Sequence, residues 1–379
     1  MKKYRLTFSL VIILFLCVGY TTLNELKYLD KHTSVVAVGD NLIHPVVYND
    51  ASQQDGTFDF SEMYKPVEQY IQSADIAYIN QESPMGGDDK AFSGFKRFNT
   101  PSQLAQNVVA SGFNLINGAN NHALDQGVAG LEHQIDLWKR HRTMYTGTFK
   151  SSEDRNNIPI KKVKGIKVAM LSYTYGTNGL KRKAPYHINY FDEAVIKRDI
   201  AKARKLSDVI IVSAHWGKEG KSKPSNKQRY YAQLFADEGV DVVLGMHPHV
   251  IQPMEWVEGK HGQRTLVAYS LGNFLNGQET GDEKNILGGS VNFDINKSPK
   301  GVSIEDVRWK SLVIHNEIVD PGNSDSRYNF AVYPLHRYPT KLADKHSVQF
   351  KEDSDMSVAH LQQHTRSIID EQFLTPTSY

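Results

Sequence analysis

A short apolar run followed by two histidines constrains the fold of this chain more than any other stretch. Val240–Leu244 has the length and the β-branched content of a buried parallel strand, and His247 and His249 follow it closely. Side chains of residues i and i+2 at a strand end leave on the same side, so we expect both histidines to face one pocket. Pro248 restricts the backbone between them. The spacing predicts a metal site, whereas the alternative is a pair of histidines on a surface loop.

The composition is that of a globular protein with a sizeable core. The chain has 379 residues, 40% of them hydrophobic and 23% charged, and its formal net charge is +2. This balance shows no bias toward nucleic acid, which we exclude as a partner. Cys17 is the only cysteine, so the chain has neither a disulfide framework nor a cysteine metal cluster.

The amino terminus has the pattern of a membrane-targeting segment. Basic residues at positions 2, 3 and 5 precede the apolar run Leu6–Gly19, which is typical of a signal sequence or a short membrane anchor. No small-residue cleavage site follows the run, so we favour an uncleaved single-pass anchor over residues 1–20, with a polar linker over residues 21–33. The basic residues then stay in the cytoplasm, and the remaining chain lies on the extracytoplasmic side of the cell membrane. A buried first helix of a soluble protein is the alternative.

Other predicted strands also end in polar side chains. Each of four further apolar runs is followed by residues that can bind metal: Ser34–Val38 by Asp40, Ala74–Ile79 by Glu82, Phe113–Asn117 by Asn120, Asn121 and His122, and Asp208–Ser213 by His215. Helical periodicity separates most of these strands, which predicts an α/β protein. Because the carboxyl ends of parallel strands meet at one edge of an open sheet, we expect these side chains to assemble one site. A turn or a helix cap is the alternative for Asp40.

Further elements follow from the same patterns. We expect helices over 60–73, 102–111, 130–142, 190–206 and 226–238, a hairpin turning at Lys164–Gly165, a strand over 265–271, antiparallel strands over 288–295 and 302–314, and a helix over 357–373. The chain after about residue 320 is otherwise polar, and we assign it no role.

The predicted ligands offer oxygen and nitrogen atoms but no sulfur. Imidazole and carboxylate groups suit manganese, zinc or iron, and two ions can bind where one carboxylate bridges them. Such a site activates water for attack on an ester or a phosphoester. His122 stands next to Asn121 and is placed to protonate the leaving oxygen. The sequence therefore predicts one or two divalent ions and a hydrolytic site.

Six polar motifs follow one another along the chain: Gly39–Asp40, Asn80–Glu82, Asn120–His122, His215–Glu219, Gly245–His249 and Ser270–Phe274. This series resembles that of the CapA family, the poly-γ-glutamate capsule synthesis proteins of the calcineurin-like metallophosphatase superfamily. The resemblance covers residues 34–315 and implies a four-layer αββα sandwich, in which two mixed sheets lie between helices. It also implies membrane anchoring with the folded domain outside. Residues 316–379 then form a C-terminal extension.

The resemblance also implies roles for individual residues. It implies that the metal ligands are Asp40, Glu82, Asn121, His215, His247 and His249, and that His122 is the general acid. We expect the remaining polar residues of the motifs to contact the substrate: Asn80, Asn120, Glu219 and Asn273. The first motif departs from the superfamily pattern, because Asp40 is followed by Asn41 and Leu42 and the usual histidine is absent. His44 is a candidate for that histidine, and Glu82 stands where the superfamily has an aspartate.

These inferences lead to a functional hypothesis. The resemblance implies a role in the biosynthesis or export of a poly-γ-glutamate capsule or a related envelope polymer, with metal-dependent hydrolysis of an anionic polymer or a phosphoester. The alternative is a non-catalytic polymer-binding or scaffold subunit of a membrane synthase complex, whose other subunits would be its partners. The altered first motif favours the alternative, whereas the presence of His122 favours the hydrolase.

Overall fold

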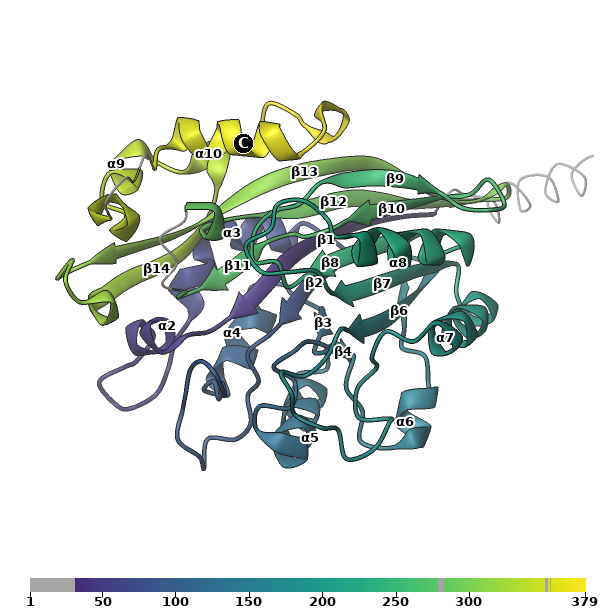
Figure 1. Cartoon of the computed structure of the whole chain (residues 1–379), viewed down its shortest axis with the longest axis horizontal. Coiled ribbons are helices and arrows are strands. Elements are labelled where there is room, and N and C mark those ends of the chain that lie inside the picture. Colours follow the sequence, from purple (N-terminus) through teal and green to yellow (C-terminus); the bar gives the residue numbers. More distant parts are fainter. Residues whose placement is uncertain (1–30, 279–282, 352–353, 355) are drawn as a thin grey trace, which may run out of the picture.

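The computed structural model describes residues 31–278, 283–351, 354 and 356–379, which form two β-sheets flanked by helices (Figure 1). The first sheet has the strand order β14 (Arg327–Pro334), β13 (Gly301–Ile318), β12 (Leu287–Ser298), β1 (Lys31–Leu42), β2 (Ile76–Gln81), β3 (Leu115–Asn117) and β4 (Met144–Thr146), and β11 (Asn273–Asn276) also pairs with β1. The second sheet has the order β5 (Ile160–Val163), β6 (Ile166–Thr174), β7 (Val209–His215), β8 (Val242–Met246), β10 (Arg264–Ala268) and β9 (Met254–Glu258).

Helices cover the outer face of each sheet. The first sheet is covered by α3 (Ser61–Gln72), α4 (Gln103–Ala110) and α5 (Gly127–Arg140), and the second by α7 (Glu193–Leu206) and α8 (Asn226–Asp237). Three shorter helices are α2 (Pro45–Asp50), α6 (Ser152–Asn156) and α9 (Thr340–Ala343). The αββα order of layers confirms the fold class expected from the sequence.

Strand alternation decides which apolar side chains fill which layer. In β1, Val35 and Ala37 pack between the two sheets, while Val36 and Val38 pack beneath the helices of the first sheet. Successive side chains of a strand point to opposite faces, so one apolar run fills both layers. Burying each larger side chain stabilises the fold by about 1.5 to 3 kcal/mol. This two-sided burial explains why a continuous apolar run precedes Asp40.

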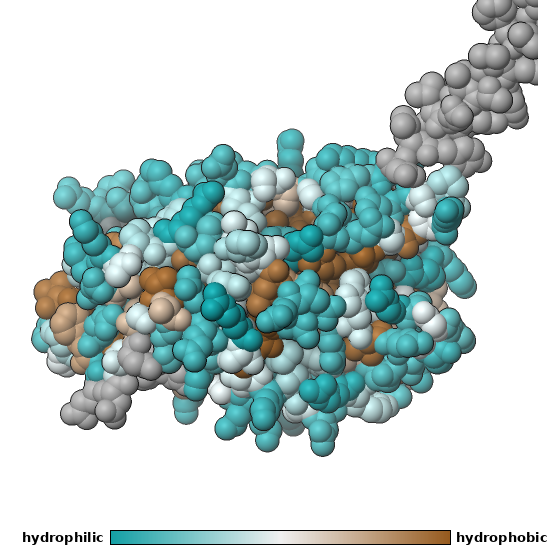
Figure 2. All heavy atoms as spheres, turned by 90° about the horizontal axis from the view of Figure 1, so that it is seen from above, coloured by the Kyte–Doolittle hydropathy of each residue, from teal (hydrophilic) through white to brown (hydrophobic). Residues whose placement is uncertain are grey.

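The C-terminal segment adds to the core between the sheets. α10 (Val358–Ile368) lies above β13 (Figure 1), and Leu361 and Phe373 join the apolar cluster that contains Phe293 and Trp309. The sequence pattern predicted this helix but missed β14, which pairs antiparallel with β13. Seen from this side, the surface is mainly hydrophilic, with apolar side chains visible in a furrow along it (Figure 2).

The strand expected over 265–271 is wrong in its second half. β10 ends at Ala268, and the chain then crosses to the first sheet, where β11 pairs in parallel with the end of β1. The crossing is close, because the Gly272 carbonyl accepts a hydrogen bond of 2.9 Å from the Asp40 N–H. A Cβ on Gly39 would lie 1.9 Å from the same carbonyl oxygen. Only glycine fits at that position, and the contact fixes the chain crossing beside Asp40.

Most other predicted elements are confirmed, with shifts of a few residues at their ends. The hairpin at Lys164–Gly165 joins β5 and β6, and the helix expected over 130–142 begins at Gly127. The predicted anchor over residues 1–20 and the linker up to residue 30 lie outside the described residues. Within the described part of the chain, no helix combines the length and the apolar character needed to cross a membrane.

Candidate metal centre

The candidate site lies where the carboxyl ends of strands from both sheets meet. The first sheet brings Asp40, Glu82 and the segment Asn120–His122, and the second brings His215, His247 and His249. Each of these side chains belongs to a residue that is at most 4% exposed. The structure thus joins predicted site residues from distant parts of the sequence in one buried cluster.

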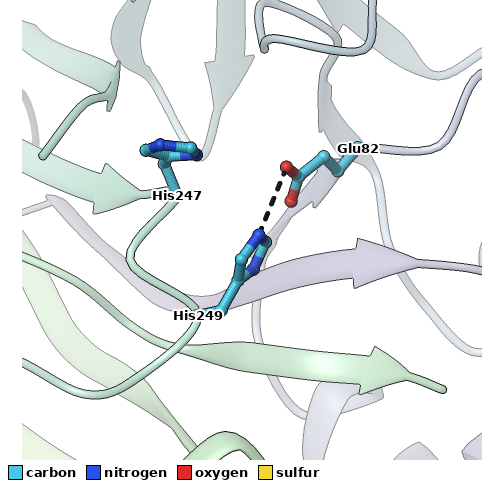
Figure 3. Close-up of side chains that lie close together, drawn as sticks. All are labelled: Glu82, His247 and His249. Atoms are coloured by element: carbon cyan, nitrogen blue, oxygen red, sulfur yellow. Dashed lines mark ion pairs between the residues drawn. The ribbon is translucent and has the colours of Figure 1, made fainter. Parts of the chain in front are cut away.

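Glu82, His247 and His249 form a group that can hold a cation (Figure 3). One ligand atom from each lies within 4.8 Å of the others. Glu82 Oε1 is 3.7 Å from His249 Nε2 and 3.5 Å from His215 Nε2. Nitrogen and oxygen ligands of a tetrahedral zinc ion lie about 2.0 to 2.2 Å from the metal. Small side-chain movements would therefore close this group on one ion.

The carboxylate of Glu82 is buried without hydrogen bonds. Its side chain is 0% exposed, and neither carboxylate oxygen has a hydrogen-bond partner among the described residues. His215 Nδ1 and His247 Nδ1 are also buried and unpartnered within that part of the chain. Burying a carboxylate is costly unless a cation or hydrogen bonds compensate for the lost hydration. The residues present therefore fit a divalent cation that binds between Glu82 and the histidines.

Asp40 lies beside this group and is already engaged by protein donors. Asn80 Nδ2 donates to Asp40 Oδ1 at 2.7 Å, the His247 N–H donates to Oδ2 at 3.1 Å, and His249 Nδ1 lies 3.2 Å from Oδ2. The three residues whose ligand atoms all lie within 4.8 Å of one another do not include Asp40. Asp40 contacts His249 and the loop that carries His247, and its role as a metal ligand stays a prediction.

The charges of the cluster shift its pKa values in opposite directions. Burial alone would raise the pKa of Asp40, but the hydrogen bond and charge of His249 outweigh it and lower this pKa. Burial alone would lower the pKa of His249, but Glu82 and Asp40 raise it to about 10. Burial, with the nearby charges of His215 and His249, holds the pKa of His247 well below its ordinary value. The cluster thus already holds a positive charge on His249 at neutral pH, where a metal cation could replace the proton.

The two histidines of the opening motif converge through loop geometry and not through strand alternation, so the reason given in the sequence analysis is wrong. His247 has φ 96° and His249 has φ 58°, both in the left-handed region. Their ring centroids nevertheless lie 5.8 Å apart. Such backbone costs roughly 1 to 3 kcal/mol per residue and persists only where contacts hold it. Two hydrogen bonds hold this backbone: the His247 N–H donates to Asp40 Oδ2, and the Gly220 N–H donates to the Pro248 carbonyl at 2.9 Å.

His122 is paired with an acidic residue that the sequence analysis missed. His122 Nδ1 lies 2.8 Å from Asp125 Oδ2, which also accepts the Phe98 N–H at 2.8 Å. The side chain of Asp125 is 0% exposed. The carboxylate orients the imidazole and leaves Nε2 as the nitrogen that can transfer a proton. The spacing His-x-x-Asp within one turn is the signal that could have revealed Asp125.

The amides predicted at the site make internal hydrogen bonds. Asn121 Oδ1 lies 2.9 Å from His215 Nε2, which in turn lies 3.5 Å from Glu82 Oε1. Asn120 Nδ2 donates to the Gln81 carbonyl at 2.9 Å, and Asn273 Oδ1 lies 3.0 Å from His249 Nδ1. Asn80, Asn120 and Asn273, which we expected to contact substrate, are all buried and bonded within the protein. Their geometry suits them to position the ligands.

His44 and Glu219 lie at the edge of the cluster. His44 Nδ1 lies 3.0 Å from the Leu42 carbonyl and accepts the Gly277 N–H at 3.2 Å, so this nitrogen faces the backbone. Burial lowers the pKa of His44 to about 3. The structure leaves His44 outside the group that can hold a cation. Glu219 is exposed and lines a cleft together with His44.

Tyr175 forms the exposed border of the site. Its ring centroid lies 4.6 Å from that of His247, and its ring stacks on His215 at 6.3 Å. The residue is 41% exposed, in contrast to the buried histidines beneath it. Its hydroxyl donates to Asn178 Oδ1 at 3.3 Å, and Asn178 in turn contacts Asn121.

Comparison with known proteins identifies relatives in one family. Residues 34–278 match the family model described as bacterial capsule synthesis protein PGA_cap. The chain is 28% identical over 253 residues to the PGA biosynthesis protein CapA of Bacillus subtilis strain 168, over 65% of this chain and 64% of the relative. It is 29% identical over 225 residues to the capsule biosynthesis protein CapA of Bacillus anthracis, over 56% of this chain and 53% of the relative. The match thus spans between about half and two thirds of these relatives.

A solved structure also shows similarity. The calcineurin-like phosphoesterase YfkN from Bacillus subtilis matches with a TM-score of 0.46 and 13% sequence identity, over 89% of this chain and 98% of that chain.

Proposed function

The chain belongs to the bacterial capsule synthesis protein PGA_cap family, and on that premise we propose that it acts in the biosynthesis or export of a poly-γ-glutamate capsule or a related envelope polymer. The names of its relatives from two Bacillus species support this proposal. We further propose that residues 1–20 anchor the chain in the cell membrane and that the folded domain is extracytoplasmic. The order of basic and then apolar residues at the amino terminus supports this topology.

The proposed activity is metal-dependent hydrolysis of a phosphoester or a similar bond. The observation that carries it is the buried carboxylate of Glu82, which faces His247 and His249 and has no hydrogen-bond partner among the described residues. A divalent cation bound there would supply Lewis-acid chemistry to the scissile bond. Glu82 and the two histidines would hold the cation, and Asp40 would keep His249 in orientation.

His122 and Asp125 would supply the proton transfer. Asp125 holds the His122 ring through Nδ1, so the other ring nitrogen would deliver the proton to the leaving oxygen. The side-chain oxygen of Asn120, Oδ1, accepts a hydrogen bond of 3.0 Å from the His122 backbone N–H and fixes the turn that carries His122. Because all three side chains are buried, the acid stays oriented between turnovers.

The contacts of Asp40, in the first of the six motifs, support a second candidate function. Asp40 is bonded to Asn80, His247 and His249, and His44 faces the backbone, so the usual ligands of a second ion are not assembled. This arrangement favours one ion over two. A single ion that only stiffens the fold would make the chain a polymer-binding or scaffold subunit of a membrane synthase complex.

Metal content and hydrolysis, measured together, test the proposal. We expect the full chain, purified without chelator, to hold close to one divalent ion and to hydrolyse bis(p-nitrophenyl) phosphate. A His247→Ala and His249→Ala double variant should lose both properties while circular dichroism shows it folded. Bound metal without hydrolysis on phosphomonoesters or phosphodiesters would favour the scaffold function. A parent protein that takes up no manganese, zinc or iron would overturn the metal-centre proposal.

A further inference from the structure

The loop over residues 93–99 forms a closed turn beside the candidate general acid. The Ser93 N–H donates to the Asn99 carbonyl at 3.1 Å, and the Asn99 N–H donates back to the Ser93 carbonyl at 3.0 Å. Within this pair, the Arg97 N–H donates to the Gly94 carbonyl at 3.0 Å. These backbone bonds hold the tip of the loop in one defined conformation.

The loop is joined to the acid at its base. The Phe98 N–H donates to Asp125 Oδ2 at 2.8 Å, and the same oxygen lies 2.8 Å from His122 Nδ1. The Phe98 ring meets the His122 ring edge-on, with centroids 4.8 Å apart. The Phe98 carbonyl accepts a hydrogen bond of 2.9 Å from Gln126 Nε2. Because one carboxylate oxygen contacts both the loop and the imidazole, the loop and the acid are held as one unit.

The other carboxylate oxygen of Asp125 has no hydrogen-bond partner among the described residues. This oxygen, Oδ1, is buried, and the Asp125 side chain is 0% exposed. Burying a carboxylate oxygen unpaired is costly, and a charge-assisted hydrogen bond offsets more of that cost than a neutral one. Asp125 therefore lacks one donor, at the oxygen that does not contact His122.

Arg97 is the cation that lies beside this oxygen. Arg97 Nη1 lies 3.9 Å from Asp125 Oδ1, and it donates to the Lys96 carbonyl at 3.1 Å, which directs the guanidinium. The Arg97 side chain is 46% exposed, so it extends from solvent to a buried carboxylate. A movement of about 1 Å would turn this approach into a charge-assisted hydrogen bond, whose length is about 2.7 to 2.9 Å.

We propose that Arg97 is a positioning residue for the hydrolysis: its guanidinium holds Asp125 through Oδ1, and Asp125 in turn holds the His122 ring. With both carboxylate oxygens bonded, His122 Nε2 stays directed at the leaving oxygen. As water attacks phosphorus, that oxygen departs with the bonding electron pair and takes the proton from Nε2, and the proton released by the water restores His122 through solvent. This inference rests on the proposed function, because it concerns the general acid of the same site.

Leaving groups of different basicity test this role. The full chain, loaded with manganese, is assayed on methyl p-nitrophenyl phosphate and on methyl phenyl phosphate. The p-nitrophenolate leaves readily without a proton, whereas the more basic phenolate depends on the general acid. Arg97→Gln should lower kcat about 10-fold for the phenyl ester and less than about 2-fold for the p-nitrophenyl ester, with KM and metal content unchanged. Arg97→Lys should recover part of the loss, because it keeps the charge but not the fork of donors.

A matched control removes the neighbouring charge of the same loop. Lys96 is exposed, and its Nζ lies 5.9 Å from the centroid of the Phe95 ring. Lys96→Gln should leave both rates unchanged. A second control combines two substitutions: in the Asp125→Asn background, Arg97→Gln should cause no further loss, because both residues act through the same carboxylate.

The outcomes separate this role from the proposed function. The role of Arg97 is overturned if Arg97→Gln lowers neither rate or both rates equally, if Lys96→Gln causes the same losses, or if the losses of Arg97→Gln and Asp125→Asn add. These results require an active parent and leave the proposed hydrolysis intact. A parent that binds metal but hydrolyses neither ester overturns the hydrolysis and the role of Arg97 together.

Discussion

The histidines of the candidate metal centre can be compared with a second buried pair, His315 and His346, which lies beneath the C-terminal segment. His315 Nδ1 lies 2.7 Å from the Tyr338 hydroxyl. His346 accepts the Val348 N–H at 3.1 Å with Nδ1 and donates to the Ile314 carbonyl at 2.9 Å with Nε2. Both residues are 0% exposed, and their rings lie 5.6 Å apart.

The two groups are equally buried but differ in their partners. Both nitrogens of His346 are satisfied by neutral backbone groups, and burial lowers its pKa to about 4, so it packs as an uncharged side chain. At the metal centre, both carboxylate oxygens of Glu82 and two ring nitrogens lack hydrogen-bond partners among the described residues, whereas in the second group His315 Nε2 is the atom in that state. Burial, spacing and one unpartnered ring nitrogen therefore do not distinguish a ligand from a structural histidine. A fully buried carboxylate without hydrogen-bond partners beside several histidines does.

The largest effect is expected from Glu82→Gln, which keeps the size of the side chain and removes its charge. Metal affinity should fall at least about 100-fold, since losing even an outer partner of a metal ligand typically costs 10- to 100-fold. Glu317→Gln is the matched control, because Glu317 Oε1 lies 3.6 Å from His315 Nε2 in the second group. Metal titration followed by elemental analysis measures both variants. If both variants retained metal equally, the candidate metal centre and the His315–His346 group would not differ in metal binding.

The next effect concerns the acidic partner of His122. Asp125→Asn should lower the rate of phosphodiester hydrolysis about 100-fold or more, within the range typical for general acid–base groups, while metal content stays that of the parent. The pH–rate profile should change as well, because the carboxylate that orients His122 is lost. An unchanged rate and profile would mean that Asp125 serves only the fold, as Tyr338 does beside His315.

A smaller effect is expected in the second group, on stability alone. His346→Gln removes ring contacts and leaves at least one buried backbone group unpaired, which should lower the free energy of unfolding by about 1 to 3 kcal/mol. Metal content should not change. Urea unfolding and elemental analysis of the same sample provide the two measurements. Loss of metal in this variant would contradict the structural role assigned to His346.

The smallest effect is a pH dependence of stability from the same residue. The unfolded chain protonates His346 near its ordinary pKa of 6.5, whereas the folded chain does so only near 4. Between these values the unfolded state binds more protons, so stability is fully present above pH 6.5 and is lost as pH falls toward 4. Between pH 7.5 and 5.5 the parent should lose about 1 kcal/mol more than His346→Gln. Equal losses in chelated samples of both proteins would refute this contribution.

Local patterns in the sequence predicted the α/β class, most of the helices and strands, and the polar residues that follow each strand. These features are local because strand and helix periodicities are set by neighbouring residues. The same patterns found Glu82, His247 and His249, since a short polar motif after an apolar run marks a strand end in an α/β sheet. They missed β14 and the partner Asp125, whose importance depends on what lies nearby in space.

The sequence by itself determined which residues could act, and the tertiary structure decided which of them meet. Packing of the two sheets brings the His247 N–H to Asp40, which is 207 residues away in the sequence. Pairing of β11 with the end of β1 brings the backbone of Gly277 to His44. The left-handed conformations of His247 and His249 also arise from these distant contacts and from no local preference. Ligand convergence depends on the sum of such long-range contacts, which no window of the sequence contains. That is why the ligand set was predicted as a list of strand ends, and its centre at Glu82 became visible only in the folded chain.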